Sequence, residues 1–254
     1  MGIFDFIKNG FLGRTKTVSE LPETKDRRFN VRYKINDPNL VAVRFSSGGE
    51  FKLRDLSYAG CFVEGDSLPD ESSFPCLIEL SAFGEILEVE ADSCHRRQSG
   101  WAIIFHYPNS SSLKKIGAII ELVRSGDSAI PVSADPVKDG DSGDIRHRFI
   151  GDGPFDLVVE EKHSGEISFF MVTLRRGGEY GSVIFKDGRV ITKKVIDVMG
   201  VSARMAQTKD IDKSLVVACA LSCLGLQFPQ GASCAKLLKD YLDRSEPRDH
   251  TIAG

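Results

Sequence analysis

Three arginines near the start of the chain have the residue type and spacing to bind an anion. Arg27, Arg28 and Arg32 lie on a short stretch just before the first strand-like run. Each guanidinium is a planar fork that can form two parallel hydrogen bonds with phosphate oxygens or with the O6/N7 edge of guanine. Arg28 and Arg32 can approach one ligand from two directions if the chain is extended or turning. This stretch therefore predicts a receptor for an anionic, phosphate-bearing ligand.

A second polar group follows at the end of a predicted strand and consists of Asp55, Ser57 and Gly60. The carboxylate offers acceptors for the N1–H and N2–H2 donors of guanine, and the serine adds a short hydroxyl. The glycine allows the backbone to turn or to approach a ligand closely. Phosphate alone would not require the carboxylate. Taken separately, both patterns have simpler interpretations, a solvated basic linker for the arginines and a β-bulge or turn for the second group.

The elements around these residues predict a small barrel. Short apolar runs separated by glycine turns favour an antiparallel sheet, and closing it would remove the exposed edges. We expect strands at 40–45, 51–56, 60–64, 76–80, 86–91 and 101–106. A helix should follow from Ser111 to about Arg124, with Gly126 as its stop.

The two polar segments, in this order and with this barrel, resemble the PilZ family of bacterial cyclic di-GMP receptors. The family signature is Arg-Arg-x-x-x-Arg followed by Asp/Asn-x-Ser-x-x-Gly. Every fixed position is met, by Arg27, Arg28, Arg32, Asp55, Ser57 and Gly60. The strand that starts at Gly100 also looks like the late Gly-x-x-x-Phe strand of the family, with one extra residue. The resemblance covers residues 25–125.

The resemblance implies how the site works. The arginine arm would wrap the ligand, with Arg28 and Arg32 on guanine edges and phosphates. Asp55 and Ser57 would hydrogen-bond a guanine from the barrel surface. An arginine just before the motif is associated in the family with an intercalated ligand dimer, so Arg27 implies two cyclic di-GMP molecules per site.

The rest of the chain predicts a second β-rich unit, so the fold class is mainly β. Strands lead through the Asp187-Gly188 hairpin turn to an apolar helix at 215–226, capped by Asp210 or Asp212, which should be the buried centre of an α+β domain. A final amphipathic helix should cover 232–244. The predicted division is an arm with a short helix (1–24), a PilZ barrel domain (25–126), a linker rich in proline, glycine and aspartate (127–145) and the C-terminal domain (146–254).

Length and composition narrow the class of protein. The 254 residues exceed the roughly 100–200 of a typical domain, so we expect two cores. The net charge of −3 argues against sequence-independent binding to nucleic acid. The six cysteines lack zinc-site spacing, and no signal peptide or membrane span is evident, so we expect reduced thiols and a cytoplasmic protein. An amphipathic helix at 3–12 could dock on the protein itself, on a partner or on a membrane surface.

No residues predict catalysis. The five histidines stand singly, without metal spacing or a neighbouring nucleophile, so we expect a protein that is not an enzyme and needs no cofactor. The first hypothesis is a cyclic di-GMP receptor that signals to an unknown protein partner through its C-terminal domain. The alternative is a PilZ-like adaptor that binds no nucleotide and acts through protein contacts, and a third is an enzyme whose activity resides in the C-terminal domain.

Overall fold

The computed structural model describes most of the two predicted domains. The described residues are 31–46, 48–65, 75–83, 85–97, 99–106, 110–137, 143–152, 155–176, 179–196, 205–207 and 210–245. Arg27, Arg28 and the predicted helix at 3–12 lie outside them.

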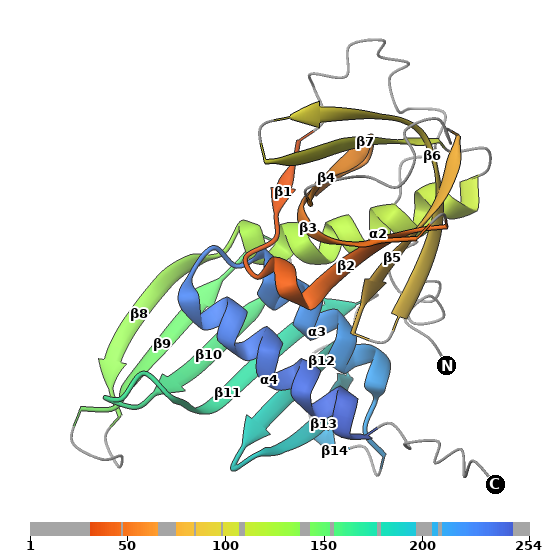
Figure 1. Ribbon diagram of the computed structural model, residues 1–254. Helices are drawn as coiled ribbons and strands as arrows, with labels where there is room; N and C mark the ends of the chain where they lie inside the picture. Colours follow the sequence, from red (N-terminus) through yellow and green to blue (C-terminus); the bar gives the residue numbers. More distant parts are fainter. Residues whose placement is uncertain are drawn as a thin grey trace, which may run out of the picture.

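Six antiparallel strands form a closed barrel, as the sequence predicts (Figure 1). They are β2 (Val41–Phe45), β3 (Glu50–Ser57), β4 (Gly60–Glu64), β5 (Cys76–Ala82), β6 (Glu85–Arg97) and β7 (Gly100–His106). Their order is β3-β2-β5-β6-β7-β4, and pairing of β4 with β3 closes the ring. A short strand, β1 (Tyr33–Lys34), pairs with β3 outside the ring, and a 3-10 turn (Pro38–Leu40) leads into β2.

The alternation of side chains explains the barrel. Val43, Val63 and Ile78 point inward and are fully buried, while their strand neighbours face outward. Strand β6 is longer than the predicted 86–91, and its pairing with β7 shifts register between Ala91 and Ser93. Such a bulge bends a strand and increases its twist, which helps one long strand to follow the curve of the barrel.

Helix α2 (Ser110–Asp127) follows β7 and lies across one end of the barrel (Figure 1). Its apolar side buries Ile116, Ile120 and Val123 completely. The predicted stop at Gly126 is wrong, because the helix continues through this residue to Asp127. The glycine serves packing instead, since a Cβ there would lie 1.8 Å from the Ser222 carbonyl oxygen of another helix.

The second unit is a seven-stranded antiparallel sheet in which each strand pairs with its neighbours in sequence. The strands are β8 (Ile130–Pro136), β9 (Ile145–Ile150), β10 (Asp156–Glu161), β11 (Ile167–Arg176), β12 (Glu179–Lys186), β13 (Arg189–Ile196) and β14 (Met205–Gln207). The Asp187-Gly188 hairpin is confirmed, and both residues have positive φ, of 50° and 72°, as a type I′ turn requires.

Much of the predicted linker at 127–145 is ordered. Residues 130–136 form β8, the edge strand of the second sheet, and α2 runs to Asp127. The prolines that suggested a linker are compatible with this position, because an edge strand tolerates a missing N–H and the pairing is bulged between Pro131 and Ser133.

Helix α3 (Lys213–Gly225) is the buried apolar helix that the sequence predicts. Asp212 caps it, accepting a hydrogen bond from the Leu215 N–H at 3.2 Å. Every residue from 214 to 225 is buried, because α3 lies among the second sheet, α2 and the amphipathic helix α4 (Pro229–Ser245) (Figure 1).

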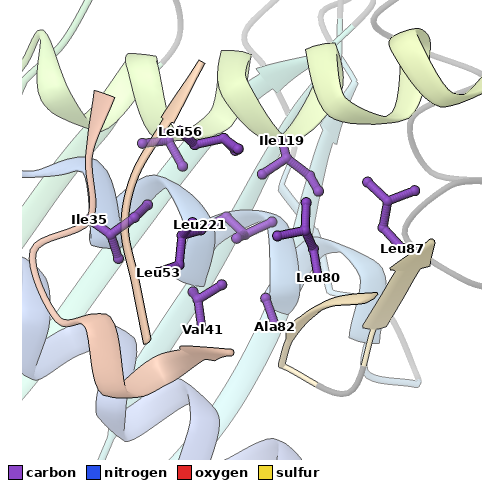
Figure 2. A pocket seen from close by; sticks show the side chains of 10 residues that line it. Ile35, Val41, Leu53, Leu56, Leu80, Ala82, Leu87, Ile119 and Leu221 are labelled. Carbon is purple, nitrogen blue, oxygen red and sulfur yellow. The ribbon is translucent and has the colours of Figure 1, made fainter. Parts of the chain in front are cut away.

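The barrel and the second sheet share one hydrophobic core rather than the two that length suggested. Figure 2 shows where they meet, with Ile119 of α2 and Leu221 of α3 facing Leu53 and Leu80 of the barrel. These side chains surround an aliphatic cavity of about 30 Å³, which is too small for a nucleotide base. Helices α2 and α3 therefore join the two units as one packed body.

Candidate functional site

The outer face of the barrel brings Arg32 and Asp55 together. The Nη1 atom of Arg32 lies 3.0 Å from the Oδ1 atom of Asp55, and their side chains are 45% and 21% exposed. Pairing of Lys34 with Asp55 in the β1–β3 ladder places the arginine beside the carboxylate. The arginine is exposed and the carboxylate is partly exposed, so solvent screens the pair and a ligand can compete for both side chains.

A bulge in β3 presents the carboxylate. The β3–β4 register shifts between Leu53 and Asp55, so Arg54 and Asp55 both lie on the outside while Leu53 and Leu56 remain in the core. Arg54 pairs with Glu64 on β4. Because of the bulge, Asp55 points outward next to Arg54, and Glu64 already binds the Arg54 guanidinium. Bulges commonly change the direction of a side chain in this way.

The surroundings of Asp55 make it an unusual acceptor. Burial raises the pKa of this carboxyl above its ordinary value, although the charge and hydrogen bond of Arg32, the backbone N–H of Phe62 and the charge of Arg97 each lower it. A partly desolvated carboxylate surrounded by donors is suited to bind further N–H groups, because low dielectric strengthens each hydrogen bond.

Ser57 and Gly60 have structural roles at the turn between β3 and β4. The Ser57 hydroxyl is buried and donates to the Gly60 carbonyl at 2.9 Å. A Cβ at Gly60 would lie 2.0 Å from the Ile103 carbonyl oxygen of β7, so only glycine allows this close approach. The expected contact of Ser57 with a guanine stays a prediction.

Two further residues share the outer face with Asp55 and were missed in the sequence. Phe62 pairs with Asp55 on one side and with Ala102 on the other, and it is half-buried. Arg97, at the end of β6, is exposed. Both residues can be identified only from the pairing of the strands, because residues opposite each other in a ladder share a face of the sheet.

The segment after Arg32 leads from the site to the second unit. The Asn36 backbone N–H donates to the Leu224 carbonyl at 2.9 Å, and its side-chain amide donates to the carbonyls of Leu226 at 2.7 Å and Phe228 at 2.9 Å. Gln227 donates back to the Lys34 carbonyl at 3.3 Å. The bonds to Leu224 and Leu226 satisfy carbonyls at the end of α3, which a helix leaves without intrahelical partners, and the bond to Phe228 reaches the turn before α4.

The turn between β3 and β4 also contacts helix α2. The Tyr58 hydroxyl donates to Glu121 at 3.4 Å, and Glu121 pairs with Arg124 at 2.7 Å. Burial, followed by the charge of Glu121, raises the pKa of Tyr58 to about 12. The tyrosine therefore stays protonated at neutral pH and acts as a hydrogen-bond donor.

Disulfides, metal-ligand clusters and membrane-spanning helices are absent from the described part of the chain. The six cysteines are free, and no group of three or more histidine, cysteine, aspartate or glutamate side chains among the described residues could hold a metal ion. No helix in the described ranges is long and apolar enough to cross a membrane.

Comparisons with known proteins give no match. No family model matches the chain, and neither a curated protein nor a solved structure does. The resemblance to the PilZ family therefore depends on the signature residues, and the barrel supplies the fold that the resemblance implies.

Proposed function

We propose that this chain is a cytoplasmic PilZ-type receptor for cyclic di-GMP. The observation that carries the proposal is the exposed Arg32–Asp55 pair on the outside of a six-stranded barrel. A guanidinium fork and a carboxylate side by side supply donors for phosphate or for the O6/N7 edge, and acceptors for N1–H and N2–H2. Guanine and phosphate are both present in cyclic di-GMP.

Binding would exchange one set of hydrogen bonds for another, and no covalent bond is made or broken. The ligand separates Arg32 from Asp55, and each then pairs with a complementary group of the nucleotide. Arg27 and Arg28 precede this point in the chain and add two guanidinium groups to the same arm. With Arg27 present, we expect two ligand molecules per site.

The route for output follows the chain from Arg32 to Asn36. Asn36, whose amide bonds the end of α3, is four positions after the proposed ligand-binding Arg32. Fixing the arm on a ligand would bias how α3 and its sheet are held, and a protein partner at the second unit would sense the difference.

Calorimetric titration of the purified chain with cyclic di-GMP tests the proposal. Arg32→Ala should weaken binding by about 1.5–3 kcal/mol, which is roughly 10- to 150-fold, because it removes charged hydrogen bonds. Arg44→Ala is a matched control, since Arg44 forms an exposed pair with Glu50 on β2 and β3 away from Asp55. Equal affinities for all three proteins would contradict the site, and one ligand per chain at saturation would contradict the role of Arg27.

The second candidate is an adaptor that binds no nucleotide. It is favoured by the structural roles of Ser57 and Gly60, which the barrel requires without any ligand. In that case the unaltered chain gives no heat with cyclic di-GMP and captures its protein partner equally with and without the nucleotide.

A further inference from the structure

The outer face of the barrel extends beyond the signature residues. In the strand ladders, Asp55 is opposite Phe62, Phe62 is opposite Ala102, and Ala102 is opposite His95. These four residues form one row across β3, β4, β7 and β6. Neighbouring strands are roughly 4.8 Å apart, so Phe62 lies next to the carboxylate that the proposed function assigns to guanine.

The ring of Phe62 lies over a flat piece of backbone. A Cβ at Gly100 would be only 3.1 Å from the Phe62 Cζ atom, so the ring extends along the face toward Gly100. The glycine is required here, since that Cβ would also lie 2.0 Å from the Val63 carbonyl oxygen. Because Phe62 is only half-buried, part of its ring remains accessible to a planar base.

Arg97 borders the same area from the other side. It pairs with Gly100 in the β6–β7 ladder, and its side chain is exposed. Its positive charge lowers the pKa of Asp55, so the two charged groups are close enough to interact. The neighbouring arginine is different, because Arg96 alternates to the opposite face and lies over the Trp101 ring at 5.8 Å.

We propose that Phe62 and Arg97 are part of the nucleotide site, Phe62 as the surface on which a guanine stacks and Arg97 as the residue that reads its O6/N7 edge. The inference rests on the proposed function and deepens it. With Asp55 on N1–H and N2–H2, the adjoining O6/N7 edge of a base lying on Phe62 would be bound by Arg97. Arginine at O6/N7 is the commonest specific contact to guanine.

This arrangement makes Arg97 a specificity-determining residue. Adenine carries an N6 amino donor where guanine has O6, so the arginine would meet a donor instead of an acceptor. Adenine also lacks the N2 amino group that Asp55 would bind. The site should therefore prefer cyclic di-GMP over cyclic di-AMP, with Arg97 responsible for a large part of the preference.

The test compares Arg97→Gln, Phe62→Leu and the matched control Arg96→Gln in titrations of the full chain with cyclic di-GMP and cyclic di-AMP. Arg97→Gln should weaken cyclic di-GMP binding about tenfold or more and reduce the preference over cyclic di-AMP. Phe62→Leu should weaken binding of either nucleotide by about fivefold or more, because stacking is tolerant of base identity. Arg96→Gln should bind like the unaltered chain.

Thermal unfolding of each variant shows that the fold is retained. If the unaltered chain binds and Arg97→Gln binds both nucleotides with native affinity, the inference is overturned while the proposed function stands. If Phe62→Leu alone retains native affinity, the stacking role is overturned. Absence of cyclic di-GMP binding by the unaltered chain would overturn the proposed function and this inference together.

Discussion

At the outer barrel face, Arg32 and Asp55 carry opposite charges and keep 45% and 21% of their side chains exposed, whereas the crossing of α2 with α3 is uncharged and buried. Gly126 and Gly225 bring the two helix backbones together there, and a Cβ on either would lie 1.8 Å from a carbonyl oxygen. The two regions should therefore tolerate amino-acid substitution to different degrees. The charged side chains of the face, Arg32 and Asp55, can be altered without loss of the fold, whereas Gly126 and Gly225 of the crossing cannot.

The same division runs through the signature itself. Asp55 is aimed outward by a bulge, while Ser57 bonds the carbonyl of Gly60 inside the turn. If the proposed function is correct, the signature combines a residue that contacts the ligand, Asp55, with residues that hold the turn in place, Ser57 and Gly60. Loss of binding in a Gly60 variant would therefore not identify Gly60 as a ligand contact.

The largest expected effect is at the helix crossing. Gly126→Ala should destabilise the protein by about 3 kcal/mol or more, because the new methyl group meets the backbone of α3 and neither helix can move aside in a shared core. Chemical denaturation monitored by circular dichroism measures the change.

Gly117→Ala is the matched control in the same helix. A Cβ there would meet the Tyr58 ring at 3.1 Å, and a side chain can shift where backbone cannot. Alanine is favoured over glycine in a helix by about 1 kcal/mol, so the net change should stay within about 1 kcal/mol. If the two substitutions destabilise the protein equally, the crossing of α2 with α3 is no more tightly packed than the rest of α2.

A smaller effect is expected at the connection between the two regions. Asn36→Ala removes the side-chain bonds to the carbonyls of Leu226 and Phe228 and should cost about 1–3 kcal/mol of stability. Asn39→Ala, which loses only a local bond to Asp37, should cost less. If Asn36→Ala leaves both stability and cyclic di-GMP affinity unchanged, the proposed route from the arm to α3 is wrong.

The smallest effect concerns the cap of α3. Burial would raise the pKa of Asp212, but hydrogen bonds from Ser214, the Leu215 N–H and Lys194, with the charge of Lys194, hold it below its ordinary value. A lowered pKa contributes stability above the unfolded pKa of about 4, and this contribution is lost as the pH falls through the folded pKa.

Asp212→Asn tests that contribution, because asparagine caps a helix about as well as aspartate and removes only the charge. The unfolding free energy of the variant should be lower by less than about 1 kcal/mol at neutral pH, since solvent still reaches this partly exposed group and screens its charge. The difference should vanish toward about pH 2. If the difference in unfolding free energy between the two proteins grows as the pH falls, the pKa of Asp212 is not lowered in the folded protein.

The strands and helices of both units could be predicted where local pattern decides them. The barrel strands alternate, Asp187-Gly188 is a turn by its own chemistry, and α3 is apolar all round and thus central. Failures occurred where distant contacts decide. Gly126 resembles a helix stop until α3 is packed on it, and the prolines of β8 resemble a linker until β9 pairs with it.

The candidate site could also be predicted only in part. Asp55 and Arg32 follow from the signature, and the structure brings them to 3.0 Å. Phe62 and Arg97 belong to no local motif, since they reach the same face only through the register of four strands. A β-bulge or turn was the simpler interpretation of the second polar group, and the structure has both, a bulge before Asp55 and a turn between Ser57 and Gly60. The exact position of the bulge could not be predicted, because it depends on how β3 pairs with β4.

Hydrogen exchange of the full chain, with and without saturating cyclic di-GMP, tests most directly whether the nucleotide binds at the outer barrel face. Amides are followed by mass spectrometry over the described ranges. We expect slower exchange in 31–36, 54–62 and 95–102, which contain the segment from Arg32 to Asn36 and the outer barrel face. Unchanged exchange throughout, or slowing confined to the sheet from β8 to β14, would contradict it.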